Sequence, residues 1–126
     1  MWTHGGERMI SPYITPKEAA KRMGVSWTTV KRRIGDGSIP TLILSPQIMR
    51  VEEKAMKPEA PEPIPPVAEM GTAELAFWFG VHPATVRRLV RDGELRGLMV
   101  GGRLVFRKKS ILAFITDHTN EGDTEE

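Results

Sequence analysis

One stretch of the sequence occurs twice, and this repetition limits the folds that the chain can adopt. Residues 80–93 recur in related form at residues 24–37, 56 positions earlier. A Gly-Val pair, a Thr-Val pair, an arginine and an Asp-Gly pair align between the two copies without a gap. Because the matches fall on turn, core and helix-end positions together, they indicate two copies of one small fold rather than a continuous repeat array.

Each copy carries the local signals of two helices joined by a tight turn. In the second copy, Pro83 suits the first position of a helix, and the pair Asp92-Gly93 suits its end. In the first copy, Ser26 is expected to cap a helix over residues 27–35. Apolar residues recur four apart on one face of each segment, and basic residues occupy the other face. This combination is typical of the second helix of a helix-turn-helix.

The flanking helices are predicted from their ends. Thr15, then Pro16 and then Glu18 match a capping box at the start of the first helix. One or two turns of a closing helix are expected at residues 52–56. In the second copy, Ser110 is expected to cap the last helix, which carries apolar residues on one side.

A hairpin is expected after each pair of helices. Apolar and β-branched residues at 39–44 and 48–51 are separated by a Ser-Pro-Gln turn, and Gly101-Gly102 separates two alternating runs. The expected fold class is mainly α with small β-hairpins, arranged as two tandem winged helix-turn-helix domains. The expected divisions are a flexible N-terminal arm at 1–12, domain 1 at 13–57, a Pro-rich acidic linker at 58–69, domain 2 at 70–118 and an acidic tail at 119–126.

Charge alternates in blocks along the chain, although the net charge is only +2. Residues 1–57 hold ten Lys and Arg against five Asp and Glu, and residues 70–118 hold eight against four. The linker and the tail are acidic. Two basic bodies suggest a polyanion as partner, although an ordinary solvated surface is the alternative. The chain has no cysteine and no apolar run long enough to span a membrane, so a cytoplasmic location and no membrane partner are expected.

Five prolines lie between residues 58 and 66 and exclude a helix or a central strand there. An extended polyproline-type spacer is the physical default, and a docking motif for an aromatic groove is the alternative. Twelve extended residues span about 37 Å, close to the ~34 Å of one turn of DNA. We therefore expect one molecule to place two recognition helices in successive major grooves.

The element order and residues resemble the small winged helix-turn-helix domains of phage excisionases and of the MerR-like family. In that family a Gly-Val-Ser turn leads into a Thr-Val-Arg-Arg type helix, an Asp-Gly or Glu-Gly stop and a Val-Gly-Gly-Arg wing. The second copy has this pattern at residues 80–88, 92–93 and 100–103. The first copy has the helices at 24–33 but departs at 45–47, where Ser-Pro-Gln replaces Gly-Gly-Arg. The resemblance implies that the second helix of each copy enters a major groove and that the wing reaches the backbone or the minor groove.

The candidate DNA-binding residues are those on the outward helix faces and at the second wing tip. Long side chains with several donors bind phosphates or pair with guanine, threonine contacts a thymine methyl, and an arginine at a glycine tip suits a minor groove. The alternative is a solvated helix face. The candidates are Thr28, Thr29, Lys31, Arg32, Ala84, Thr85, Arg87, Arg88, Arg91 and Arg103.

Three aromatic residues stand beside these helices. Trp27 is expected to pack rather than to contact bases. Phe77 and Trp78 occupy positions where the first copy has Lys21 and Arg22. We expect them to pack against the final helix near Phe114, with an exposed patch for a protein partner or for the other repeat as the alternative.

These features predict a sequence-specific double-stranded DNA-binding protein, an excisionase (recombination directionality factor) of a phage or mobile element. Its expected partners are DNA and an integrase or recombinase, or a second copy on DNA. A transcriptional regulator (repressor) and a protein-interaction module that does not bind DNA are the alternatives. MerR-like regulators add a dimerisation helix and an effector domain, neither of which is expected after residue 116, so no small-molecule ligand is expected.

An enzyme is not expected. The three histidines, His4, His82 and His118, are scattered, and no nucleophile–base pair, phosphate-binding glycine loop or metal-ligand spacing is present in the sequence. His82 is predicted to be a helix cap. No catalytic residue, metal or cofactor is expected.

Overall fold

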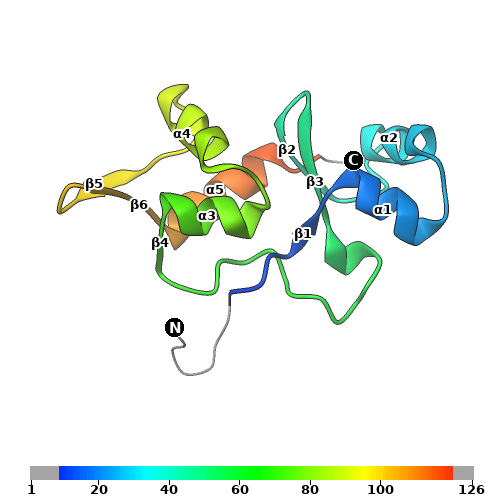
Figure 1. The fold of residues 1–126 in the computed structure, drawn as a ribbon, viewed down its shortest axis with the longest axis horizontal. Coiled ribbons are helices and arrows are strands. Elements are labelled where there is room, and N and C mark those ends of the chain that lie inside the picture. Colours follow the sequence, from blue (N-terminus) through cyan, green and yellow to red (C-terminus); the bar gives the residue numbers. More distant parts are fainter. Residues whose placement is uncertain (1–8, 121–126) are drawn as a thin grey trace, which may run out of the picture.

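The same order of elements occurs in both halves of the molecule (Figure 1). The computed structural model describes residues 9–120. The first half contains β1 (Tyr13–Ile14), α1 (Pro16–Met23), α2 (Trp27–Gly35), β2 (Thr41–Ser45), β3 (Ile48–Glu52) and the 3-10 helix η2 (Glu53–Ala55). The second half contains β4 (Glu69–Gly71), α3 (Thr72–Phe79), α4 (Pro83–Arg91), β5 (Leu98–Val100), β6 (Arg103–Arg107) and α5 (Lys108–His118).

The helices and small hairpins of the expected class are present, but the described part of the chain is mixed α/β rather than mainly α, because each hairpin belongs to a three-stranded sheet. Each hairpin gains a third strand from the residues before the first helix of its half. The sheets have the antiparallel orders β1-β3-β2 and β4-β6-β5. With only two or three residues, β1 and β4 are too short to show an alternating pattern in the sequence.

The helix ends confirm most of the predicted caps. The side chains of Thr15, Ser26 and His82 accept hydrogen bonds from backbone N–H groups at 3.1, 3.2 and 3.0 Å. Both α1 and α3 end at a glycine in the left-handed conformation, Gly24 and Gly80, with φ of 68° and 78°.

Two predictions about helix ends are wrong. The Glu18 carboxylate pairs with Arg22 at 2.9 Å instead of closing the capping box. Ser110 lies inside α5, which starts at Lys108 because the helix follows β6 without a loop. The short closing helix expected at residues 52–56 is confirmed as the three residues of η2, which take the place that the longer α5 has in the second half.

Both predicted hairpins are confirmed. Gly101 and Gly102 both have positive φ, 59° and 80°, as a two-residue type I′ turn requires, and Val100 pairs with Arg103 on either side of it. In the first hairpin, the Ser45 hydroxyl accepts hydrogen bonds from two backbone N–H groups of the turn. We call the hairpin of β5 and β6 the wing.

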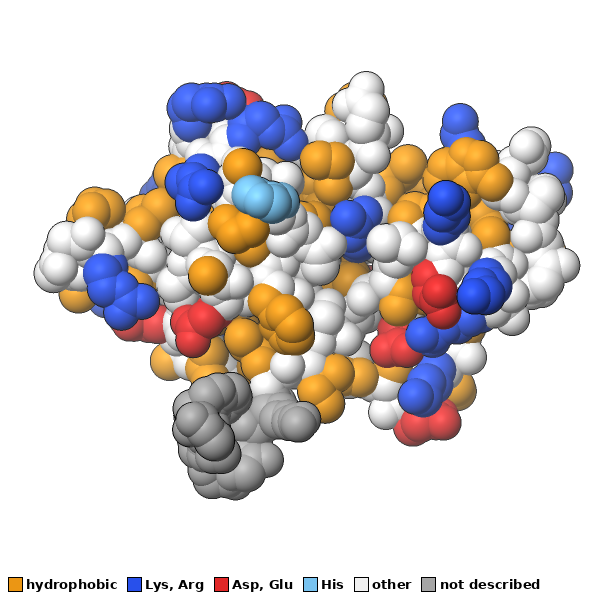
Figure 2. Space-filling view, viewed as in Figure 1, with side chains coloured by type: hydrophobic (Ala, Val, Ile, Leu, Met, Phe, Trp, Pro, Cys, Tyr) orange, Lys and Arg blue, Asp and Glu red, His pale blue; other side chains and the backbone are white. Residues whose placement is uncertain are grey.

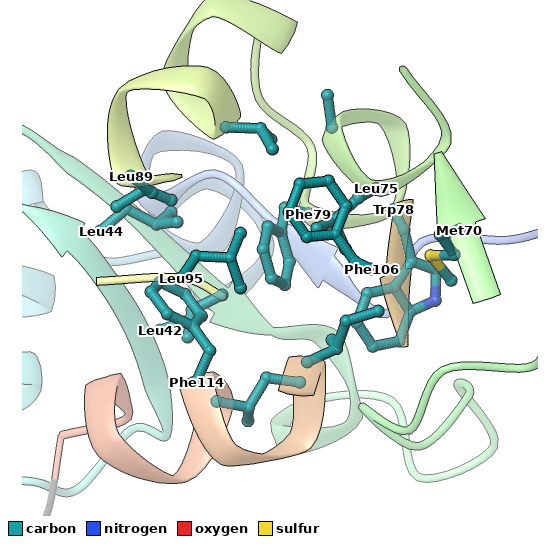
Figure 3. Packing of buried hydrophobic residues seen from close by; sticks show 14 of the residues in the cluster. Leu42, Leu44, Met70, Leu75, Trp78, Phe79, Leu89, Leu95, Phe106 and Phe114 are labelled. Carbon is teal, nitrogen blue, oxygen red and sulfur yellow. The ribbon is translucent and has the colours of Figure 1, made fainter. Parts of the chain in front are cut away.

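Two hydrophobic clusters form the core, and the larger one crosses between the halves. The smaller cluster lies within the first half and includes Val30 and Ile34 of α2. In the larger cluster, Tyr13, Leu42 and Leu44 of the first half join the buried side chains of the second half (Figure 3). The rings of Tyr13 and Trp78 meet edge to face, with centroids 5.8 Å apart. The core of the second half is therefore completed by side chains of the first.

The segment between the halves is folded, so a fully extended spacer is wrong for residues 57–64. The N–H of Ala60 bonds the carbonyl of Lys57 at 2.8 Å, and Lys54 pairs with Glu62 at 2.9 Å. Ala60 is buried. The distance between the two helix pairs is thus set by packing rather than by linker length.

Residues 1–8 of the expected N-terminal arm and residues 121–126 of the acidic tail lie outside the described part of the chain. Within the part that the structure describes, no helix is long and apolar enough to cross a membrane.

Candidate nucleic-acid interface

The helix α4 is anchored by its apolar face. Val86 and Leu89 are almost completely buried in the larger cluster. At its N-terminus, the left-handed Gly80 turns the chain, and the N–H of Val81 bonds the carbonyl of Ala76 at 2.9 Å. Because the turn and the buried face, against which Val90 also packs, fix the orientation of α4, its arginines lie on the outer side of the helix.

The outward face of α4 is basic. Arg87 and Arg91 are exposed, and Arg88 is partly exposed. Arg91 lies 3.6 Å from Asp92 in a solvent-exposed pair, whereas the side chains of Arg87 and Arg88 make no hydrogen bond or ion pair with another described residue. Figure 2 shows Lys and Arg side chains gathered over α4. Arginines without structural partners remain available for phosphates or base edges.

The other two candidates on α4 lie near its start. Ala84 is exposed and Thr85 is partly exposed. The N–H of Ala84 is occupied by the ring of His82, which confirms His82 as a cap. Both side chains therefore stand on the N-terminal turn, the part of a recognition helix that contacts base edges.

The outward face of α2 also carries threonine and basic side chains, as that of α4 does. Thr28, Lys31 and Arg32 are exposed, whereas Thr29 is partly buried and its hydroxyl lies 3.1 Å from that of the capping Ser26. The ammonium group of Lys31 lies 5.9 Å from the ring centroid of Trp27, within cation–π range. Trp27 is 44% exposed and is not part of either cluster, so its ring packs only at the surface.

The side chain of Arg103 does not extend outward from the wing tip, as a minor-groove contact would require. It begins β6, it is exposed, and one guanidinium nitrogen lies only 3.1 Å from where a side chain on Gly71 would begin. The guanidinium therefore lies back over β4. The neighbouring strand β5 instead exposes three apolar side chains, those of Leu98, Met99 and Val100.

Two polar residues that were not predicted from the sequence connect the halves. Arg50 of β3 donates a hydrogen bond from Nε to the carbonyl of Gly80 at 2.8 Å. Asn120, after α5, donates from Nδ2 to the carbonyl of Ile34 at 2.7 Å. These pairs are 30 and 86 positions apart, so no local pattern could have indicated them.

Metal ligation has no support in the described residues, which contain no group of three or more His, Cys, Asp or Glu able to hold a metal ion.

The paired helices α3 and α4, with their left-handed turn and basic outer face, define a helix-turn-helix, the class of fold that presents one helix to duplex DNA. Residues 69–119 match the helix-turn-helix domain family. This match runs from β4 to the residue after α5 and supports a helix-turn-helix DNA-binding domain in the second half of the chain. No match was found among curated proteins or among solved structures.

Proposed function

We propose that this protein binds double-stranded DNA sequence-specifically, with α4 as its main recognition helix and α2 as a second. The observation that carries this proposal is the division of α4 into a buried apolar face and an outer face whose Arg87 and Arg88 have no partner among residues 9–120. Ordering an arginine side chain costs entropy that a bound ligand offsets. Phosphate oxygens and guanine edges offer acceptors that match the N–H donors of a guanidinium group.

The proposed contacts are divided between base reading and backbone positioning. Arg87 and Arg88 bind guanine edges or phosphates, and Arg91 exchanges its exposed pair with Asp92 for a phosphate. On α2, the corresponding contacts come from Thr28, Thr29, Lys31 and Arg32. Arg103 reaches the DNA backbone or the minor groove by rotating away from Gly71.

We propose further that the DNA-bound protein has an architectural, excisionase-like role beside an integrase or recombinase. The supporting observation is the shared core, because two recognition helices on one body impose their own geometry on DNA and favour sites that bend to fit it. A transcriptional regulator (repressor) would use the same contacts. A bend in the bound duplex, measured by energy transfer between its labelled ends, supports the architectural role, and a straight duplex supports the regulator.

Selection of duplexes from a random pool, followed by fluorescence anisotropy over a salt series, tests DNA binding itself. We expect affinity to fall steeply with salt, because bound arginines release counterions from the phosphates. Arg87→Ala should reduce the slope of log affinity against log salt by about 1. Lys17→Ala, at an exposed position on α1, is the matched control and should leave the slope unchanged. Absence of salt-dependent binding to any selected duplex would exclude the proposal.

A further inference from the structure

The hairpin of β2 and β3 occupies the place of a wing in the first half, but it packs against the second half. Leu42 and Leu44 of β2 are buried in the larger cluster, and Ile48 of β3 packs partly against it. Figure 3 shows Leu42 and Leu44 among the aromatic and aliphatic side chains of the second half. In Figure 1 this hairpin stands between α2 and α4. It is therefore a structural connection between the two recognition helices rather than a free DNA-binding arm.

Arg50 extends this connection to the turn before α4. Its Nε donates to the carbonyl of Gly80, the residue that ends α3, and its Nη1 donates to the carbonyl of Met49 at 2.7 Å. Arg50 is only partly exposed, and burial lowers the pKa of its guanidinium. Burying part of a charge costs free energy, and here the Nε donor of that charge is directed at the turn that orients α4.

Asn120 makes the reciprocal connection from the second half to α2. Its Nδ2 donates to the carbonyls of Ile34, in the last turn of α2, and of Ile39, at 2.7 and 3.0 Å. Its Oδ1 accepts the N–H of Thr41, and its own N–H bonds the carbonyl of Thr41, both at 2.9 Å. Asn120 thus satisfies the end of α2 and the start of β2 together.

We propose that Arg50 and Asn120 are positioning residues that lock α2 and α4 in one relative arrangement, so that the protein accepts only DNA whose two contacted segments have the matching spacing. Each half supplies one side chain to the helix-turn-helix of the other half, and the larger cluster holds the halves together between these two points. The fixed arrangement stands on these contacts alone. The spacing rule rests on the proposed function.

Distance measurement between spin labels tests the fixed arrangement without DNA. The native sequence has no cysteine, so Thr28→Cys on α2 and Ala84→Cys on α4, both at exposed positions, give one labelled pair. We expect a single narrow distance distribution that a Gly/Ser insertion between Pro61 and Glu62 leaves unchanged. The double variant Arg50→Ala/Asn120→Ala should broaden it, and Lys17→Ala should not.

A distribution that widens on linker insertion, or one that stays narrow in the double variant, would overturn the fixed arrangement. Circular dichroism and the melting temperature establish that each variant is folded. The linker insertion alters neither Arg50 nor Asn120, so it keeps the inference testable even if the double variant does not fold.

The spacing rule is tested on the selected duplex with base pairs inserted between its two contacted segments. An insertion of about five base pairs rotates one segment to the opposite face of the duplex, and the loss of one of two linked contacts should weaken binding about 100-fold. The linker insertion should not restore this affinity, whereas the double variant should show a clearly smaller loss.

Restoration of the affinity by the linker insertion, or the same loss of affinity in the double variant, would refute the spacing rule. Failure to bind any duplex would refute both the rule and the proposed function, while the spin-label distances would still decide the fixed arrangement.

Discussion

Adjacent residues with similar side chains have opposite positions in this fold. Trp78 is 1% exposed and packs on Tyr13, whereas Phe77 is 58% exposed. The expected packing near Phe114 is wrong for Phe77, since Phe79 lies beside Phe114 with its ring centroid 5.7 Å away, whereas Trp78 is buried in the same cluster as Phe114. Composition shows that α3 is unusually apolar, but only the position of β1 determines which of its aromatic rings is covered.

The two recognition helices provide a comparison at the residue scale. Arg88→Ala should weaken DNA binding by about 1–3 kcal/mol, and Arg32→Ala by less, because α4 is accompanied by a wing with Arg103 while the hairpin beside α2 is packed against the second half. Fluorescence anisotropy on the same duplex at one salt concentration measures both losses. Equal losses, or a larger loss for Arg32→Ala, would show that α2 dominates recognition.

Gly97 is required because neighbouring side chains leave no room for a β-carbon, not because of its backbone conformation. A side chain there would lie 2.9 Å from Leu104 and 2.9 Å from the buried ring of Phe106. Gly97→Ala should therefore lower the free energy of unfolding by about 1–3 kcal/mol, as overpacking of a core does. Gly35→Ala is the control, because no atom lies within 4 Å of the added carbon and Ala favours the helix. Chemical denaturation measures the free energy of unfolding of both variants. An unchanged free energy of unfolding in Gly97→Ala would contradict the close contact with Leu104 and Phe106.

At the scale of elements, the wing is the least supported part of the second half. All three residues of β5 are exposed, and the strand lies at the edge of its sheet. Its pairing with β6 depends on a turn in which two consecutive residues have positive φ. The turn was predictable because a Gly-Gly pair between alternating runs is a strong local signal, whereas the direction of Arg103 over Gly71 depends on β4.

Substitutions of Gly101 test whether DNA binding depends on the conformation of the wing turn. Gly101→Ala places a β-carbon in the left-handed region at a cost of roughly 1–2 kcal/mol, so the wing should fray and DNA affinity should fall. Gly101→Asn is the control, since asparagine tolerates this conformation and Asn-Gly favours the type I′ turn. The nuclear magnetic resonance chemical shifts of Arg103 report fraying of the wing, and fluorescence anisotropy measures the DNA affinity. Equal DNA affinity for both variants would indicate that the wing does not contribute.

At the scale of the whole molecule, the two halves share the larger of the two hydrophobic clusters. Tyr13 is nearly fully buried, and its hydroxyl, which has no hydrogen-bond partner among the described residues, is buried with it. Burial, with a smaller contribution from Glu52, raises the pKa of this hydroxyl, so it stays protonated. Removal of the first half would expose Trp78 and the rest of this cluster to water.

A shared core predicts one cooperative unfolding transition for the described body. Leu44→Ala should lower the free energy of unfolding by about 2–5 kcal/mol and shift the whole transition, although Leu44 belongs to the first half and the cluster mostly to the second. Val67→Ala, at an exposed site, should change it by less than about 0.5 kcal/mol. Tryptophan fluorescence and far-ultraviolet circular dichroism should give coincident curves. Two separated transitions, with Leu44→Ala shifting only one, would show independent domains.

Local sequence was sufficient to predict the helix pairs, their caps and both hairpins, because each depends on residues a few positions apart, such as Ser26 with Thr29 or Gly101 with Gly102. The basic face of α4 was predictable for the same reason. How the halves join was not predictable, since Arg50 with Gly80 and Asn120 with Ile34 meet only after the chain has folded. The proline-rich segment indicated an extended spacer, but burial of Leu42, Leu44 and Trp78 stabilises a packed arrangement instead. Repetition in the sequence therefore determines the two similar helix pairs, and long-range packing determines how α2 and α4, the proposed recognition helices, are placed relative to each other.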